Sequence, residues 1–292
     1  MNNDLVPQIA SGIAMGGLYG LVAMSIVFTY RSTYVLNFAQ GEMAMLGTYI
    51  YWTISQFIPI WFAIFLTLIL SFFMGTLLER LLLRRLDKNN PSSSLVLTIG
   101  LLMVINSTVQ WWYGPIQKSV PSPFGSGVIR LASYNFSLHA IGTILMVLLA
   151  VAILIILFKF TQLGLALRAT AENWRAAQLM GIPVDSMLNL GWAISAVLGT
   201  VAGILVAPIL VLVPSMMQPV MMYAYSGAVI GGLESPVGAL AGGILIGVVE
   251  NLAGTWSPIG SDLKIVIAFA LTFVVLSIFP NGLFAKREAR LY

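Results

Sequence analysis

The chain has 292 residues, of which 59% are hydrophobic and only 8% charged, whereas about 25% of residues are charged in an average soluble domain. A soluble fold of this size could not cover its surface with so few charges, so the composition indicates an integral membrane protein. The formal net charge of +4 does not indicate nucleic-acid binding, because the basic residues are dispersed along the chain rather than gathered in one stripe.

Apolar stretches long enough to cross a bilayer recur along the chain, since a membrane helix needs about 20 mainly apolar residues. No charged residue lies between Leu5 and Tyr30, or between Met43 and Leu78. We therefore predict an all-α polytopic helical bundle that forms one transmembrane domain over residues 1–292. About seven full spans are expected, over Gln8–Tyr30, Tyr34–Thr53, Trp61–Leu83, Ser94–Trp112, Leu138–Phe160, Met187–Leu212 and Leu263–Phe279.

The segment Pro219–Glu250 is predicted to be a broken or re-entrant helix pair, or two short spans. Its apolar run is interrupted by Gly231–Pro236, which leaves two arms shorter than a full span. Non-helical backbone at membrane depth is tolerated only where protein or a water-filled cavity receives its polar groups. The break therefore indicates a transport pathway or a tight subunit contact, and the alternative is a simple turn at the membrane surface.

Basic residues predict the orientation, because Lys and Arg concentrate in short cytoplasmic loops. We expect the three basic clusters on the cytoplasmic side, the N-terminus outside and the C-terminus in the cytoplasm. The segment Pro219–Glu250 must then return to the side that it left. The clusters are Arg80, Arg84, Arg85 and Lys88; Lys159, Arg168 and Arg175; and Lys286, Arg287 and Arg290.

Polar residues inside the apolar stretches are candidates for a translocation pathway, because ionisable groups in a membrane are costly and commonly functional. Glu42 follows Asn37 and Gln40 in an otherwise apolar run. The alternative is that Glu42 lies near the inner headgroups and orients the second span. Glu234 and Ser235 have a comparable setting in the later broken segment, and a polar break in each half suits the internal duplication common in transporters.

The loop at about 161–186 differs from the rest of the chain and is expected in the cytoplasm. The residues from Arg168 to Met180 favour a short helix with an i to i+4 pair of Arg168 and Glu172, ended by Gly181. Arg175 lies within it, and the small side chains of Ala176 and Ala177 would let another protein approach closely. The alternative is a solvated surface helix.

This loop resembles the coupling segment of ABC importer permeases, which docks into a cleft on an ATPase subunit. The matching positions are Glu172, Ala176, Ala177 and Gly181. Together with NFAQGEMAMLGTY and GGLESPVGALAGG, they make the chain similar, from about Gly12 to Phe284, to the shorter permease subunit of the branched-chain amino acid importer family. That family commonly has a small residue where this chain has Glu234.

The resemblance implies a permease in the bacterial inner membrane that works with several partners. A periplasmic binding protein would deliver solute, a second and related permease chain would complete the pathway, and two ATP-binding subunits would drive transport. The sequence has no G-x-x-x-x-G-K-[ST] phosphate loop, so ATP would be bound by the partners and the chain itself would hold no cofactor. The departure at Glu234 leaves open a solute other than leucine, isoleucine or valine, such as urea, a short amide or an aromatic carboxylate.

Two other function classes compete with this interpretation. A stand-alone carrier driven by an ion gradient would favour ionisable residues within several spans, and few are present. A membrane-embedded enzyme would need a convergent set of acid, base, nucleophile or metal ligands. The chain has no Cys and one His, so we expect no catalytic residue and no metal site.

Overall fold

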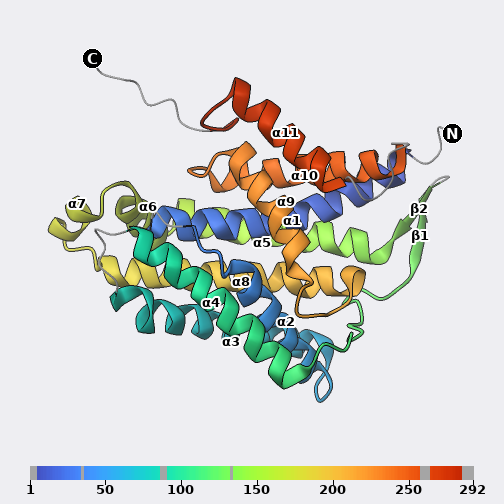
Figure 1. The fold of residues 1–292 in the computed structure, drawn as a ribbon, viewed down its shortest axis with the longest axis horizontal. Helices are drawn as coiled ribbons and strands as arrows, with labels where there is room; N and C mark the ends of the chain where they lie inside the picture. The colour runs from blue at the N-terminus through green and yellow to red at the C-terminus, as the bar shows by residue number, and fades with distance from the viewer. Residues whose placement is uncertain (1–4, 34–35, 86–90, 132–133, 257–263, 285–292) are drawn as a thin grey trace.

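The computed structural model describes residues 5–33, 36–85, 91–131, 134–256 and 264–284. Figure 1 shows an elongated bundle with a β-hairpin at one end and two short helices, α6 and α7, at the other. The described elements are α1 Leu5–Thr33, α2 Gln40–Ser55, α3 Ile60–Leu81, the short 3-10 helix Leu83–Arg85, α4 Pro91–Tyr113, β1 Val128–Leu131, β2 Tyr134–Ser137, α5 Leu138–Phe160, α6 Gln162–Glu172, α7 Trp174–Leu179, α8 Val184–Leu210, α9 Met217–Gly231, α10 Pro236–Trp256 and α11 Lys264–Ile278.

The structure confirms an all-α, multi-pass membrane architecture. Within the described residues, six helices are long and apolar enough to cross a bilayer, namely α1, α3, α4, α5, α8 and α10. The expected count of seven full spans is not confirmed, because α2 has 16 residues and α11 has 15. The antiparallel hairpin of β1 and β2 lies in the connection between α4 and α5.

Helices α1 and α8 form the centre of the bundle. In their most apolar windows, 89% of α1 and 72% of α8 are buried, against 22% in both α4 and α5. The close contact of α1 with α10 depends on glycine: a Cβ added at Gly247 would clash with Gly16 Cα, and one added at Gly243 would clash with Gly20 N. Small residues at four-residue spacing, such as Gly12, Gly16 and Gly20 of α1, allow two membrane helices to approach this closely.

Helix α2 begins inside the bundle rather than at its surface. After α1 the chain turns back without helical structure at residues 36–39, and Figure 1 shows α2 starting beside the middle of the bundle. Asn37 makes this start possible, because its Oδ1 accepts a hydrogen bond from Ala39 N (3.0 Å) and its carbonyl accepts one from Gln40 N (3.3 Å). The helix predicted over Tyr34–Thr53 is therefore shorter at its N-terminal end.

The broken segment differs from its prediction in one arm. Helix α9 is short, with 15 residues, but α10 has 21 residues and is a full-length span candidate. The predicted second arm ended at Glu250, the first charged residue after the break. In the structure its carboxylate accepts a hydrogen bond from Tyr19 of α1 at 2.8 Å, so the helix continues past it.

The turn between α9 and α10 begins at Gly232, whose φ of +96° ends α9. It packs against the residues that follow α11, because Leu283 N donates to Ile230 O at 2.8 Å. Residues 257–263, between α10 and α11, lie outside the described residues. The same is true of the C-terminal basic cluster of Lys286, Arg287 and Arg290.

Candidate functional site

A buried polar network holds the non-helical residues before α2, and the first residue of α2, to helix α8. Asn37, Gln40 and Ser195 are all fully buried. Gln40 Nε2 donates to Ser195 O at 3.0 Å, its Oε1 accepts from Ser195 Oγ at 2.9 Å, and Asn37 Nδ2 lies 3.3 Å from the same Oε1. Two of the predicted pathway residues, Asn37 and Gln40, thus have partners in the protein core, and they fix the bend before α2.

Glu42 follows Gln40 in the first turn of α2 and points toward α4. Its side chain is only 4% exposed, and its Oε2 accepts a hydrogen bond from Asn106 Nδ2 at 3.1 Å. Asn106 Nδ2 also lies 3.1 Å from Pro214 O, and Gln110 donates to Asn106 Oδ1. The sequence interpretation missed Asn106 and Gln110. Their signal was available, because they are two amides one helical turn apart in a mainly apolar span.

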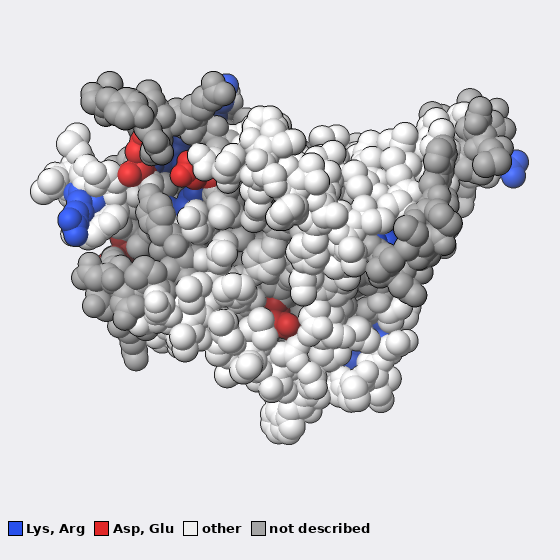
Figure 2. Space-filling view, turned by 45° about the horizontal axis from the view of Figure 1, so that its top comes forward, with Lys and Arg blue, Asp and Glu red and all other residues white. Residues whose placement is uncertain are grey.

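A hollow of about 210 Å³ opens beside Glu42 on the lateral face of the bundle. Apart from Glu42 its walls are mainly apolar or aromatic, and they come from the start of α2, from α4 and from α9. Figure 2 shows that the middle of the molecule is almost free of charged side chains, with one isolated acidic patch. The lining residues are Phe38, Gly41, Glu42, Leu102, Met217, Gln218, Met221, Met222 and Tyr225.

Glu234 and Ser235 lie in the turn between α9 and α10, and neither lines this hollow. Glu234 is exposed. Ser235 begins α10, because its Oγ accepts a hydrogen bond from Gly238 N at 3.0 Å and Pro236 follows at the first helical position. The structure therefore brings Asn37, Gln40 and Glu42 together and leaves the pair in the turn apart from them.

The segment 161–186 forms two helices instead of the single one expected over Arg168–Met180. Asn173 separates α6 from α7, with φ of −154°, and its side chain accepts a hydrogen bond from Ala176 N at 3.0 Å. Asn is a preferred N-cap, so it starts a new helix here. The predicted i to i+4 pair does not form: Arg168 Nε donates to Gly164 O at 3.4 Å, and the one ion pair within the described residues is elsewhere.

The most exposed part of this segment is an apolar tip at the end of α7. Leu179 is 89% exposed and Met180 is 83% exposed, and Gly181 follows with φ of +80°. Sequence interpretation emphasised Ala176 and Ala177, but Ala177 is buried. The signal for the tip was a pair of large apolar residues in a polar loop. Of the other predicted residues, Arg168, Arg175, Ala176 and Gly181 are exposed, as is Glu172.

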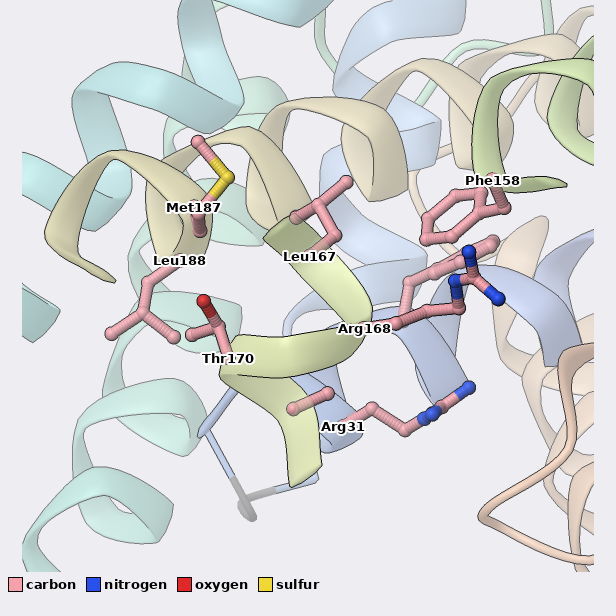
Figure 3. A pocket seen from close by; sticks show the side chains of 10 residues that line it. Arg31, Phe158, Leu167, Arg168, Thr170, Met187 and Leu188 are labelled. Atoms are coloured by element: carbon pink, nitrogen blue, oxygen red, sulfur yellow. The ribbon is translucent and has the colours of Figure 1, made fainter. Parts of the chain in front are cut away.

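Helix α6 rests on the ends of three long helices. Figure 3 shows Leu167 and Thr170 of α6 beside Met187 and Leu188 of α8, with Arg31 and Arg168 at the rim of a small hollow. Leu167 and Thr170 are buried. Phe28 and Phe158 line the same hollow, and their rings stack with centroids 4.8 Å apart. Helix α6 therefore contacts α1, α5 and α8.

An ion pair fixes the start of α8 at the same end of the bundle. Arg84 Nη2 lies 2.7 Å from Asp185 Oδ2. This hydrogen bond and the negative charge of Asp185 raise the pKa of Arg84 above its ordinary value. Both side chains are nearly half exposed, so the pair is expected to add little to stability.

Comparison with known proteins gives consistent matches over nearly the whole chain. Residues 8–276 match the family described as the branched-chain amino acid transport system permease component. The chain is 29% identical to the high-affinity branched-chain amino acid transport system permease protein LivH of Salmonella typhimurium, over 96% of each chain. It is 30% identical to the probable branched-chain amino acid transport permease protein LivH of Methanocaldococcus jannaschii, over 93% of this chain and 90% of that protein.

A shorter match relates part of the chain to a permease that is named for a different solute. The nucleoside ABC transporter permease protein NupC of Lactococcus lactis is 28% identical over 55% of this chain and 41% of its own length. No significant match was found among solved structures. Since the family match covers most of the residues, including α2, the segment 161–186 and the turn between α9 and α10, the chain belongs to the family of branched-chain amino acid transport permease components, and it is a permease subunit of an ABC importer.

Proposed function

We propose that this permease imports branched-chain amino acids across the bacterial inner membrane. The observation that carries this proposal is the similarity to proteins named as branched-chain amino acid permeases, which extends over 96% of the chain and 96% of the Salmonella protein. A full-length match includes the helices that would form the pathway and those that would contact other subunits. The match to the nucleoside permease covers only 55% of the chain and supports that cargo less.

A second permease chain is proposed to cover the face formed by α2, α4 and α9. Lipid cannot satisfy amide and carboxylate groups, yet Glu42, Asn106, Gln110 and Gln218 lie on or beside this lateral face. A related but different chain would bury these groups and leave an aqueous pathway between the two subunits. In this proposal Glu42 lines the pathway, Asn37 and Gln40 hold its wall, and Glu234 and Ser235 lie at its inner mouth.

One ATP-binding subunit is proposed to dock on α6 and α7 of this chain, and a second one on the partner permease chain. The contact would include the apolar tip of Leu179 and Met180 and the exposed polar residues around it. ATP would be bound and hydrolysed by those subunits, so this chain would hold no cofactor. Because α6 rests on three long helices, movement of an ATP-binding subunit could be transmitted to the pathway. The predicted contact residues are Arg168, Glu172, Arg175, Ala176, Ala177 and Gly181.

The hairpin end of the bundle is proposed to face the periplasm, where the solute-binding protein would dock, and the α6–α7 end to face the cytoplasm. The N-terminus would then lie outside and the C-terminus inside. Helix α1 supports this arrangement, since its one basic residue, Arg31, lies in its last turn. Short helices α2, α9 and α11 would complete their crossings with non-helical backbone, and α10 would return the chain to the outside.

The test is ATP hydrolysis by the reconstituted assembly, purified through this chain, during titration with solute-loaded binding protein. Stimulation by the leucine-loaded form, and not by forms loaded with urea or benzoate, is the expected result. If only the urea-loaded or the benzoate-loaded binding protein stimulated ATP hydrolysis, that solute would be the cargo instead of leucine. Uptake driven by an imposed ion gradient in this chain alone would refute the ATP-driven mechanism.

A further inference from the structure

The carboxylate of Glu42 lacks a cationic partner within the described part of the chain. The one ion pair found there joins Arg84 to Asp185. Glu42 is only 4% exposed, and one of its two oxygens accepts the hydrogen bond from Asn106, while no described donor reaches the other. A carboxylate at membrane depth is costly unless a counter-charge or water meets it. Since Glu42 lines the hollow, a bound cationic group could supply that charge.

The walls of the hollow suit an aliphatic side chain. Met217, Met221 and Met222 supply flexible thioether chains that adapt to different apolar shapes. Phe38 and Tyr225 form an aromatic pair, with ring centroids 5.9 Å apart. The volume of about 210 Å³ is below the roughly 300–1,000 Å³ typical of pockets for drug-sized ligands. The hollow therefore fits a small solute that is partly apolar.

The first turn of α2, which lies beside the hollow, carries backbone N–H groups without an acceptor among the described residues. The backbone N–H groups of Gly41 and Glu42 lie in the first turn of α2, and in the described structure neither has a backbone acceptor or a side-chain cap. Such groups, with the positive end of the helix dipole, favour a negatively charged ligand group. Gly41 exposes its backbone to the hollow, and a Cβ there would lie 2.5 Å from Met221 Cγ.

We infer that this hollow is a binding site for the zwitterionic part of an α-amino acid, with a preference for aliphatic side chains. The ammonium group would pair with the Glu42 carboxylate, the carboxylate would meet the N–H groups of Gly41 and Glu42, and the side chain would pack against the methionines of α9. This inference rests on the proposed importer function and adds recognition within the permease itself. A half-helix whose N-terminus meets a substrate carboxylate is a known arrangement in transporters.

The absence of cysteine from the natural chain allows a direct binding test. Gln218→Cys places one thiol in the lining of the hollow, and its rate of reaction with N-ethylmaleimide is measured in the purified importer without binding protein. Leucine should slow the reaction most. 3-Methylbutylamine, which keeps the ammonium group, should slow it more than 4-methylpentanoate, which keeps only the carboxylate. Ile116→Cys, in an exposed loop outside the hollow, should react at the same rate with every ligand.

The role of Glu42 is tested by two variants in the Gln218→Cys background. Glu42→Gln keeps the size and the hydrogen-bond acceptor but removes the charge, so the leucine concentration that gives half protection should rise roughly tenfold to a hundredfold. Glu42→Asp keeps the charge and should retain protection by the amine. Equal protection by leucine in Glu42→Gln and in the parent would overturn the inference, as would equal protection by the amine and the acid.

The proposed binding site and the proposed importer function can be refuted independently of each other. Hydrolysis stimulated by leucine-loaded binding protein, combined with no amine-dependent protection of Gln218→Cys, would refute the binding site and leave the importer proposal in place. Amine-dependent protection without such stimulation would support the site and remove the proposed coupling to ATP. Because Glu42 and Gln218 line the same hollow, Glu42→Gln removes a negative charge near the thiol and should speed its ligand-free reaction, so protection is expressed relative to the ligand-free rate of each variant. An unchanged thermal unfolding midpoint of the double variant shows that it is folded.

Discussion

Single glycines determine how closely α1 and α10 pack. A Cβ added at Gly16 would lie 2.7 Å from Ile244 Cα, and the obstacle is backbone, which cannot move aside as a flexible side chain could. Gly16→Ala should therefore lower the free energy of unfolding by about 1–3 kcal/mol. Gly100→Ala is the matched control, because nothing lies within 4 Å of its added Cβ. Thermal unfolding of both variants in detergent gives the comparison, and equal midpoints would contradict the packing.

A buried carboxylate in α3 depends on one amide in α8. Asn189 Nδ2 donates to Glu79 Oε2 at 2.7 Å, and Glu79 is only 3% exposed. Asn189→Leu should destabilise the protein by about 1–3 kcal/mol, because it leaves the carboxylate buried without this donor. Adding Glu79→Leu should restore part of the loss, since both polar partners are then gone. A double-mutant cycle in thermal stability measures the coupling, and strictly additive losses would argue against it.

The sequence could predict which polar residues are unusual, but not which side chain would meet them. Glu42 was identified because it interrupts an apolar run, whereas Asn106 joins it only through the packing of α4 on α2. Asn37 and Gln40 have the same sequence signal as Glu42, yet their side chains turn toward Ser195 in the core. The partner of each side chain depends on which helices pack together in three dimensions, and a single sequence does not reveal that packing.

At the level of elements, the exposed tip of α7 has the character of a docking surface. Leu179 and Met180 are two adjacent, strongly exposed apolar side chains in a polar segment, which suits a surface that a partner covers. Leu179→Asp should greatly reduce copurification of the ATP-binding subunits and leave membrane insertion intact. Ile116→Asp is the matched control, because Ile116 is 72% exposed and lies in the loop that precedes the β-hairpin. Equal reduction by both variants would indicate a general loss of stability instead.

Helix boundaries show where local sequence signals were sufficient and where tertiary contacts decided. Gly181 and the Asn173 cap are local signals, and the first was recognised while the second was missed, so two helices were predicted as one. The length of α10 is not determined by local sequence. A hydrogen bond from Tyr19, more than 200 residues away in sequence, stabilises Glu250 within the helix. Long apolar helices such as α3 and α5 were predicted well, because lipid requires an uninterrupted apolar run.

The arrangement of the whole molecule predicts opposite accessibility of its two ends. Because the natural chain has no cysteine, a single Ser126→Cys beside the hairpin or Gln162→Cys at the start of α6 can report its side of the membrane; both residues are exposed. In spheroplasts, a membrane-impermeant maleimide should label Ser126→Cys at once and Gln162→Cys only after permeabilisation. The basic residues near α6 favour the cytoplasmic side, and α6 and the hairpin lie at opposite ends of the bundle in Figure 1.

Labelling in the opposite order would invert the orientation and place the proposed ATPase contact in the periplasm, where no ATP is available to drive transport. Labelling of both cysteines without permeabilisation would mean that α5 does not cross the membrane, since β2 leads directly into α5 and α6 follows it. That outcome is disfavoured physically, because α5 is a 23-residue helix of which only 22% of the apolar window is buried by the protein. The remaining apolar surface needs lipid around it, so crossing the bilayer is the arrangement that removes it from water.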